Sequence, residues 1–155
     1  MRSVPFLFLG VLMFFTLSAK AQLKDEKTPA PDAKGINFFH GSLDEALDLA
    51  RSQKKLVFID AFTEWCGPCK MMAATTFLDE KVANFFNESF INVKLDMEKG
   101  EGPDVAAKYK VNAYPTLLFL NPRGSLLHTI VGFRKAPEFL EEARTAVNPK
   151  TNTAA

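Results

Sequence analysis

The hydrophobic and polar positions of the chain fall into short blocks whose lengths indicate strands separated by helices. Three apolar runs rich in β-branched and aromatic residues are typical of strands that are buried on both faces of a sheet. These runs are residues 56–62, 90–96 and 116–120. The Asn-Pro-Arg-Gly sequence at 121–124 has the composition of a turn, so residues 125–131 are expected to pair back as a hairpin partner. Residues 36–40 are a weaker candidate for a first strand.

Apolar residues recur at helical spacing between the predicted strands. Ser42, with Glu45 three residues later, matches the capping-box pattern and predicts a helix over residues 42–53. The segment after the first long strand is compatible with a helix that is broken near residues 75–79. Asp79 is expected to cap the continuation of this helix, whose apolar residues share one face.

Two more helices complete the pattern. A short one is expected to end near Tyr109, and Pro137 is typical of the first turn of a last helix. The predicted order β-α-β-α-β-α-β-β-α indicates an α/β fold in which a central mixed β-sheet is flanked by helices on both faces. A chain of 155 residues suits one such domain, which we place at residues 36–148.

The N-terminal residues have the three parts of a secretory signal peptide. Arg2 supplies a positive start, residues 4–17 are apolar, and the small-residue sequence ending at Ala21 is typical of a cleavage site. The apolar run is shorter than the roughly 20 residues that span a bilayer, so cleavage is favoured over retention as a membrane anchor. We therefore expect residues 1–21 to be a signal peptide and the protein to be periplasmic or secreted.

The segments on either side of the predicted domain are polar. Residues 22–35 are rich in Lys, Asp, Pro and Ala, which predicts a flexible leader, and residues 149–155 are expected to form a disordered tail. Removal of the signal peptide takes away Arg2 and Lys20 and no acid, which changes the formal net charge from +1 to −1. The mature sequence has no basic run or basic patch interleaved with aromatic residues, so we expect no nucleic-acid partner. We also expect a monomer.

The chain has only two cysteines, Cys66 and Cys69, although exported proteins commonly use cysteine in structural disulfides. A disulfide between residues three apart closes a very small loop and adds little entropic stabilisation, so the pair is better explained as reactive. The pair lies where the first long strand gives way to a helix. A thiolate at a helix start faces unpaired N–H groups and the positive end of the helix dipole, so Cys66 is expected to ionise readily and act as the nucleophile.

A pair of cysteines at this spacing can also form half of a zinc site or attach a haem group. A zinc site needs two more ligands, and His40 and His128 follow no ligand spacing. A c-type haem site needs a histidine directly after the second cysteine, where Lys70 stands. We therefore expect no metal and no cofactor, and we expect both histidines to be ordinary surface or strand-end residues.

The sequence WCGPCK at residues 65–70, directly after a buried strand, together with Tyr-Pro-Thr at 114–116 before a later strand, resembles the thioredoxin family. The similarity extends over about residues 36–147. It implies a thioredoxin fold and a thiol:disulfide oxidoreductase. In such a protein Cys66 attacks a substrate disulfide, and Cys69, one turn further and more buried, resolves the mixed disulfide. The Gly-Pro pair between the cysteines is that of the reducing thioredoxins, so the resemblance favours a disulfide reductase.

Asp60 lies in the middle of an otherwise apolar strand, six residues before Cys66, where burying a carboxylate is costly. The thioredoxin family places a buried acid at this position and pairs it with a lysine on the next strand, which here matches Lys94. Burial is expected to raise the pKa of Asp60, which suits it to relay a proton, through water, to or from Cys69. The alternative is an aspartate at the strand edge that points to solvent.

The resemblance also implies a substrate-docking edge beside the cysteines. Pro115 matches the family's cis-proline, which faces the cysteine pair and lets the backbone of Tyr114 pair with an extended substrate chain. Trp65 is expected to pack beside the cysteines, and Gly132 to allow close approach of substrate, although a single glycine is also common in an ordinary turn. The residues expected to bind substrate are Trp65, Gly67, Pro68, Tyr114, Pro115, Thr116 and Gly132.

The chain departs from small thioredoxins after the second cysteine, because they carry a helix-kinking proline where this chain has Ala74. Residues 75–82 instead resemble periplasmic thioredoxin-like modules, including the C-terminal domain of the DsbD electron-relay family. This resemblance implies protein disulfides as substrates and a membrane electron relay, or another thiol donor, as the partner. A disulfide oxidase or isomerase, and a thioredoxin-fold binding module without turnover, remain as alternative functions.

Overall fold

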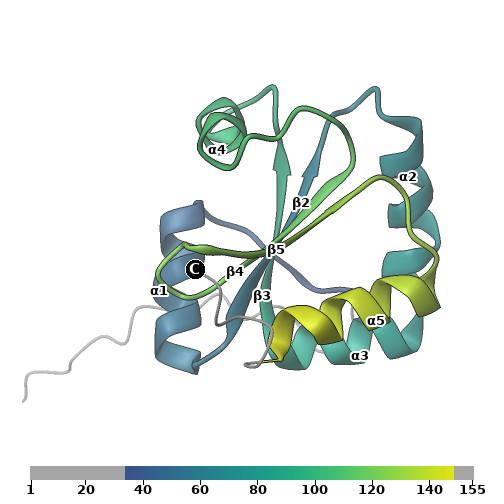
Figure 1. The fold of residues 1–155 in the computed structure, drawn as a ribbon, viewed down its shortest axis with the longest axis horizontal. Coiled ribbons are helices and arrows are strands. Elements are labelled where there is room, and N and C mark those ends of the chain that lie inside the picture. The colour runs from purple at the N-terminus through teal and green to yellow at the C-terminus, as the bar shows by residue number, and fades with distance from the viewer. Residues whose placement is uncertain (1–33, 149–155) are drawn as a thin grey trace, which may run out of the picture.

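A five-stranded sheet forms the centre of the computed structural model, which describes residues 34–148 (Figure 1). The strands are β1 (Phe38–Phe39), β2 (Leu56–Phe62), β3 (Phe90–Asp96), β4 (Thr116–Leu120) and β5 (Leu126–Val131). Their order across the sheet is β1-β3-β2-β4-β5, with β1, β3 and β2 parallel and β4 antiparallel to both of its neighbours. This is the predicted mixed sheet, and the three apolar runs form strands at the predicted residues. The weak candidate at 36–40 contributes only two residues.

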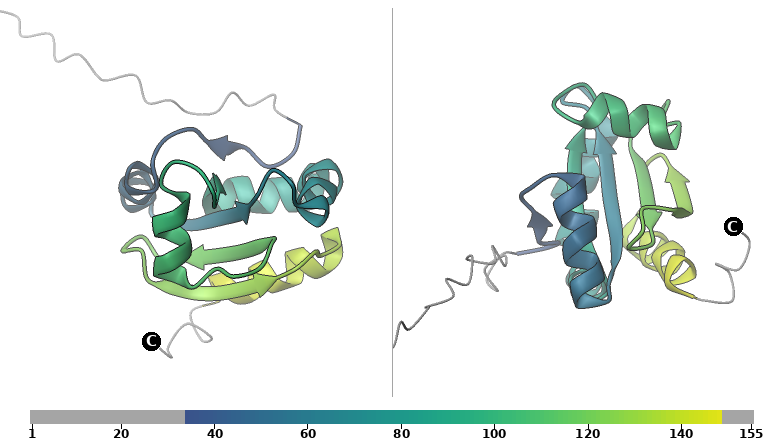
Figure 2. Two further views of the ribbon diagram at one scale, coloured as in Figure 1. Left: turned by 90° about the horizontal axis from the view of Figure 1, so that it is seen from above. Right: turned by 90° about the vertical axis from the view of Figure 1, so that its left-hand side faces the viewer.

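Helices cover both faces of the sheet, as the sequence predicts. They are α1 (Leu43–Gln53), α2 (Gly67–Ala74), the 3-10 helix η1 (Thr76–Leu78), α3 (Glu80–Ser89), α4 (Gly102–Tyr109) and α5 (Ala136–Val147). In the two further views, α1 and α4 lie on one side of the strands, and α2, α3 and α5 lie on the other (Figure 2). The α/β fold class is therefore confirmed.

The predicted interruption after the first long strand is a real break in the helix. Helix α2 ends at Ala74, one turn of 3-10 helix follows, and α3 begins at Glu80. The carboxylate of Asp79 accepts hydrogen bonds from the backbone N–H groups of Lys81 at 3.0 Å and Val82 at 3.1 Å. A capping carboxylate satisfies N–H groups that have no partner within the helix, so it fixes where α3 starts.

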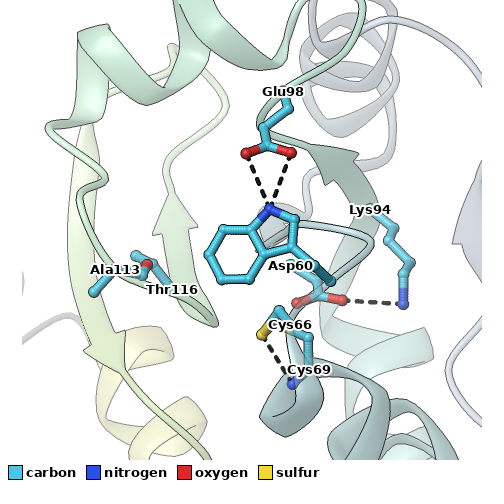
Figure 3. The surroundings of a disulfide bond; sticks show 8 residues. Asp60, Cys66, Cys69, Lys94, Glu98, Ala113 and Thr116 are labelled. Atoms are coloured by element: carbon cyan, nitrogen blue, oxygen red, sulfur yellow. Dashed lines mark hydrogen bonds and ion pairs between the residues drawn. A yellow bond between two sulfur atoms is a disulfide. The ribbon is translucent and has the colours of Figure 1, made fainter.

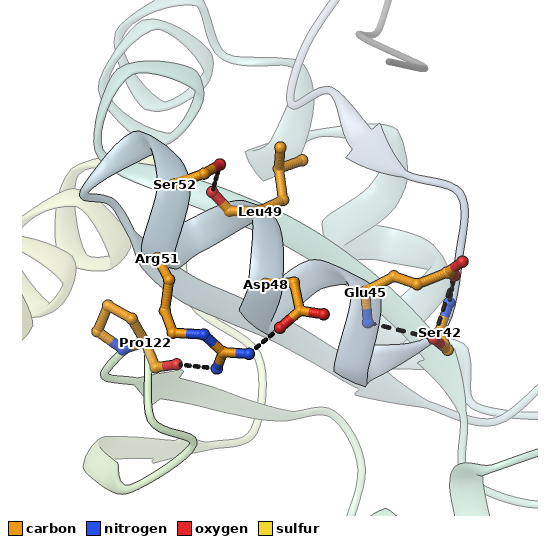
Figure 4. Close-up of polar contacts among 7 residues, drawn as sticks. All are labelled: Ser42, Glu45, Asp48, Leu49, Arg51, Ser52 and Pro122. Atoms are coloured by element: carbon orange, nitrogen blue, oxygen red, sulfur yellow. Dashed lines mark hydrogen bonds and ion pairs between the residues drawn. The ribbon is translucent and has the colours of Figure 1, made fainter. Parts of the chain in front are cut away.

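The start of α1 shows the predicted capping box (Figure 4). The Ser42 hydroxyl accepts from the backbone N–H of Glu45 at 3.2 Å, and the Glu45 carboxylate accepts from the backbone N–H of Ser42 at 2.8 Å. Near the end of the helix, Arg51 forms an ion pair with Asp48 and donates to the carbonyl of Pro122 at 2.9 Å. The last bond ties α1 to the turn between β4 and β5.

The sheet separates two cores of different composition. We call the core under α2, α3 and α5 the aromatic face and the core under α1 and α4 the aliphatic face. The aromatic face consists of Ile36, Phe58, Met72, Phe77, Val82, Phe86, Phe90, Leu117, Phe119, Ile130, Phe139, Ala143 and Ala146. The aliphatic face consists of Leu43, Ala46, Leu47, Ala50, Val57, Ile59, Ala61, Ile91, Val93, Met97, Val105, Leu118 and Leu120. Because side chains alternate along a strand, β2 and β3 contribute to both cores.

Three predicted segments lie outside the described residues. They are the signal peptide at 1–21, the leader as far as residue 33, and the tail at 149–155. Within residues 34–148, no helix is long and apolar enough to cross a membrane.

Candidate active site

Cys66 and Cys69 form a disulfide at the start of α2, with their Cα atoms 5.3 Å apart. Cys66 is the N-cap residue of the helix, and its Sγ accepts a hydrogen bond from the backbone N–H of Cys69 at 3.1 Å. Its own backbone N–H donates to the carbonyl of Thr63 at 3.1 Å, which anchors the turn between β2 and the helix. The sulfur therefore occupies the position where an anion is stabilised by the helix N-terminus.

The two cysteines are equally buried, with 3% of each residue exposed. The prediction that Cys69 is the more buried of the two is therefore wrong for the oxidised protein. The disulfide explains this, because a bond between the sulfurs draws both of them against the first turn of the helix. The neighbouring residues Trp65, Gly67 and Pro68 are exposed, so the buried disulfide lies just beneath the surface of the protein.

Trp65 is the most exposed large apolar residue among those described, with 66% of its surface accessible. Its indole N–H donates to both carboxylate oxygens of Glu98, at 3.0 and 3.1 Å (Figure 3). Its ring also meets the ring of Tyr114 edge to face, with centroids 5.8 Å apart. Trp65 is thus held from two sides, by the loop after β3 and by the segment before β4, while one surface remains free.

The segment before β4 is the one for which the sequence predicts a docking edge. The peptide bond between Tyr114 and Pro115 is cis, as the resemblance implies. The Thr116 hydroxyl donates to the carbonyl of Ala113 at 2.8 Å and closes the turn that contains this bond (Figure 3). The backbone N–H of Gly132 donates to the carbonyl of Pro115 at 2.8 Å, so the end of β5 supports the same segment.

Gly132 has a φ of 89°, a conformation that side chains with a Cβ rarely adopt. An added Cβ would meet only the Arg134 guanidinium, at 3.9 Å. The glycine is therefore explained by its backbone conformation, and space near it remains open.

Asp60 lies on β2 beside Lys94 of β3, because the two residues are register partners in parallel strands. The aspartate is 1% exposed, which excludes the alternative of a carboxylate that points to solvent. The Lys94 ammonium lies 3.3 Å from Oδ2 and forms an ion pair with it, whereas Oδ1 has no hydrogen-bond partner among the described residues. Burial raises the pKa of Asp60 from the ordinary value of 3.8 to about 6, and the charge of Lys94 opposes part of this rise.

The buried carboxylate of Asp60 has one charged partner, Lys94, and one oxygen without a partner. A buried polar atom normally has a partner, so the unpaired Oδ1 leaves this carboxylate able to bind water or to take up a proton. Figure 3 draws Asp60 in the surroundings of the disulfide. With a pKa close to neutrality, Asp60 can be protonated or ionised near physiological pH, which is the property of a general acid or base.

The sequence did not identify Glu98 as a site residue. A usable signal exists, since the carboxyl ends of adjacent parallel strands lie at the same edge of a sheet. β2 leads to Trp65 and β3 leads to Glu98, so an acid after β3 is well placed to meet the tryptophan. The same loop bears Lys99, which forms an ion pair with Glu64 and lies 3.7 Å from Asp96. The hydrogen bond with Glu64 is the main reason that the pKa of Lys99 is raised.

The two histidines have no part in this site. His40 is exposed after β1. His128 on β5 lies 2.8 Å from Glu142 on α5 and packs against Phe119.

Comparisons with known proteins agree with this geometry. The family model Thioredox_DsbH, described as "Protein of unknown function, DUF255", matches residues 34–130. A solution structure from Bacteroides thetaiotaomicron, provisionally named a disulphide-isomerase, has 48% sequence identity and a TM-score of 0.68, and the match covers 76% of this chain and 97% of that one.

Two curated relatives match shorter parts of their own sequences. Thioredoxin-T of Drosophila melanogaster is 38% identical over 90 residues, which are 58% of this chain and 52% of the relative. The thiol:disulfide interchange protein DsbD of Pseudomonas fluorescens is 31% identical over 84 residues, which are 54% of this chain and 14% of that protein. The chain thus spans about half of the first relative and a small part of the second. It belongs to the thioredoxin-like DsbH family and has a disulfide oxidoreductase fold with a Cys-x-x-Cys pair at Cys66 and Cys69.

Proposed function

We propose that this protein is an exported thiol:disulfide oxidoreductase that reduces disulfides in other proteins. The observation that carries the proposal is the Cys66–Cys69 disulfide at the N-terminus of α2, with the buried carboxylate of Asp60 in the same site. The exposed ring of Trp65 and the segment at Tyr114–Pro115 offer a surface on which an extended substrate chain can lie.

The reaction begins with the reduced protein. The Cys66 thiolate attacks one sulfur of a substrate disulfide, the substrate S–S bond breaks, and the departing substrate thiolate takes a proton from solvent. Asp60 then accepts the proton of the Cys69 thiol, through water, and the Cys69 thiolate attacks Cys66. The bond between Cys66 and the substrate breaks, and the second substrate sulfur leaves as a thiolate that takes a proton from solvent, so the substrate gains two electrons and the protein ends with the Cys66–Cys69 disulfide.

Turnover requires a donor that returns two electrons to this disulfide. The similarity to a segment of DsbD supports a membrane electron relay, or another thiol donor, in this role. The sequence features of residues 1–21 support a cleaved signal peptide and a periplasmic or secreted location. Cell fractionation followed by determination of the N-terminal residue would test both: a chain that begins at Met1 would contradict cleavage, and recovery from the cytosol alone would contradict export.

The first test is the reduction of insulin by dithiothreitol, with and without the protein. We expect the wild-type chain to accelerate the reaction and Cys66→Ser to abolish the acceleration, because the attacking sulfur is lost. Equal rates for the two proteins would contradict the proposed function. Cys69→Ala extends the test, because it should accumulate stable mixed disulfides with substrates, whereas thiol-independent complexes would favour the binding-module alternative.

A disulfide isomerase or oxidase is the second candidate, and the name of the relative from Bacteroides thetaiotaomicron favours it. The two functions differ in the stability of the disulfide. Equilibration of the protein with reduced and oxidised glutathione separates them, because a reductase holds its disulfide at a much more reducing potential than an isomerase or oxidase.

A further inference from the structure

The Lys94 ammonium is surrounded by aromatic rings as well as by Asp60. Its Nζ lies 4.7 Å from the ring centroid of Phe62, 5.7 Å from that of Phe38 and 5.9 Å from that of Phe77. All three distances are within the range of cation–π attraction. The rings come from β2, β1 and η1, so three separate elements converge on one charged group. We call these three residues the Lys94 cradle.

The cradle bears on the position of Lys94 during proton exchange at Asp60. When Asp60 accepts a proton, Lys94 loses its counter-charge, and Asp60 is its only ion-pair partner among the described residues. The lysine side chain is 30% exposed, so its flexible stem could carry the ammonium out into water. Such a movement would remove the charge that favours the ionised form of Asp60.

The other charged groups nearby do not replace Asp60. β1, β4 and η1 contain no ionisable residue. On β3 the remaining acid is Asp96, which lies 3.7 Å from Lys99 and accepts from the backbone N–H of Glu98. On α2 the ionisable residues are Lys70, which is exposed, and Cys69, which is in the disulfide.

We infer that the Lys94 cradle, through Phe62 above all, is a positioning device that keeps the Lys94 ammonium beside Asp60 whether Asp60 is charged or neutral. The faces of the rings supply negative potential that does not change with pH. The rings therefore stabilise the ammonium in the state in which its counter-ion is absent. That the rings hold the ammonium beside Asp60 does not depend on the proposed function. The consequence for catalysis does, because it rests on the proposed proton relay.

Phe62 is the member of the cradle that can be changed with least damage to the fold. Phe77 belongs to the buried aromatic face. The Phe38 ring packs edge to face against the Phe77 ring, with the two centroids 5.7 Å apart. Phe62 is half-buried at the end of β2 and belongs to neither core. It also lies closest to the ammonium of the three rings.

Removal of the Phe62 ring is expected to change the pKa of Asp60 in one direction. In Phe62→Leu the ammonium spends more time in water, so Asp60 loses part of the attraction that favours its charged form, and its pKa rises. We expect the midpoint of the Asp60 titration to move upward by about half a pH unit, as a partly exposed cation–π contact predicts. Phe62→Trp retains an aromatic face and should keep the midpoint at or below that of the wild type.

The experiment is an NMR titration of the Asp60 side-chain carboxyl carbon in the oxidised full-length protein. The variants are Phe62→Leu, Phe62→Met, Phe62→Trp, Lys94→Gln, and Phe62→Leu combined with Lys94→Gln. Phe62→Met removes the ring with little loss of volume and replaces Phe62→Leu if that variant does not fold. The expected result is an upward shift with Leu or Met, no upward shift with Trp, and no further shift when Leu is added to Lys94→Gln.

Two results would overturn the inference. One is an unchanged Asp60 midpoint in Phe62→Leu and Phe62→Met. The other is that Phe62→Leu shifts the midpoint as much in the Lys94→Gln background as in the wild type. The second result would mean that the ring acts through burial and not through the ammonium. Because the titration needs no substrate, failure of the proposed function is detected separately. If the midpoint of the Asp60 titration moves but the pH profile of insulin reduction does not follow it, the role of the cradle is supported and the proton relay is contradicted.

Discussion

The two faces of the sheet are built from the same strands but from different side chains. Each core has thirteen buried residues, and six on the aromatic face are phenylalanines whereas the aliphatic face has none. Phe58 is central to the aromatic face, with five other phenylalanine rings at centroid distances between 4.8 and 6.5 Å, and Phe86 of α3 also meets five rings. The aliphatic face instead fits Ala46 and Ala50 of α1 closely against β2 and β3.

The difference corresponds to where the buried carboxylate and the buried amide are placed. Among residues 34–148, the buried carboxylate of Asp60 and the buried amide of Asn92 share the pleat side of Phe58, toward the aromatic face. Ring edges carry partial positive charge and ring faces partial negative charge, so an aromatic core can solvate a polar group in a way that methyl groups cannot. The comparison teaches that the side of the sheet beneath α2 tolerates a titrating group, while the other side provides rigid support.

The largest expected effect tests the packing of the aromatic face. Phe58→Ala removes the ring that five others contact, and we expect it to lower the free energy of unfolding by about 3–5 kcal/mol. The matched change on the other face is Leu118→Ala, a fully buried residue that should cost about 2–5 kcal/mol but less than Phe58→Ala. Urea unfolding of both variants without reductant measures the difference. A larger loss in Leu118→Ala would contradict the central place given to Phe58.

The next effect tests the buried charge. Because the pKa of Asp60 is about 6 in the folded protein and 3.8 is its ordinary value, the folded state binds more protons than the unfolded state between these pH values. Stability therefore falls as pH rises through this window, by up to about 3 kcal/mol at neutral pH. Asp60→Asn should remove this loss, and so stabilise the oxidised protein at pH well above 6, while slowing disulfide exchange.

Urea unfolding below pH 4 and above pH 7 measures the effect of Asp60→Asn. The matched control is Ile59→Val, the adjacent residue on the aliphatic face, which should cost about 0.5–1.5 kcal/mol at both pH values. If Asp60→Asn is destabilising above pH 7, the loss of the partner of Lys94 outweighs the gain from removing a buried charge.

Most of the fold could be predicted from local patterns. The runs at 56–62, 90–96 and 116–120 became strands at those residues because each is bounded by polar residues or turns and is long enough to cross the sheet. The cap at Ser42 was also predictable, because its partner is only three residues away. The first strand was overestimated, since the edge position of β1 leaves only two residues paired with β3.

The site could be predicted only where a motif or a resemblance supplied long-range information. The cysteine pair is a local motif, but the pairing of Asp60 with Lys94 came from the resemblance, because 34 positions separate them. No pattern predicted that Phe38, Phe62 and Phe77 would surround the same ammonium. Each is an ordinary apolar residue in its own element, and their convergence depends on the order of β1, β3 and β2 in the sheet.

The smallest expected effect concerns the helix ends, where the two faces should behave alike. Ser42 caps α1 over the aliphatic face, and Asp79 caps α3 over the aromatic face. Each side chain accepts backbone N–H bonds at the surface, so Ser42→Ala and Asp79→Ala should each lower the free energy of unfolding by about 1 kcal/mol. Added salt should reduce only the effect of Asp79→Ala, because only this cap is charged and interacts with the helix dipole.

Urea unfolding at low and high salt measures both cap variants. Equal losses in the free energy of unfolding at high salt would mean that the two faces differ in their buried side chains and not in their helix caps. A loss several times larger for Asp79→Ala would instead mean that its cap also holds η1 in place, and η1 contributes Phe77 to the Lys94 cradle. In that case the same variant should also raise the pKa of Asp60, and the helix start would be part of the machinery that positions Lys94.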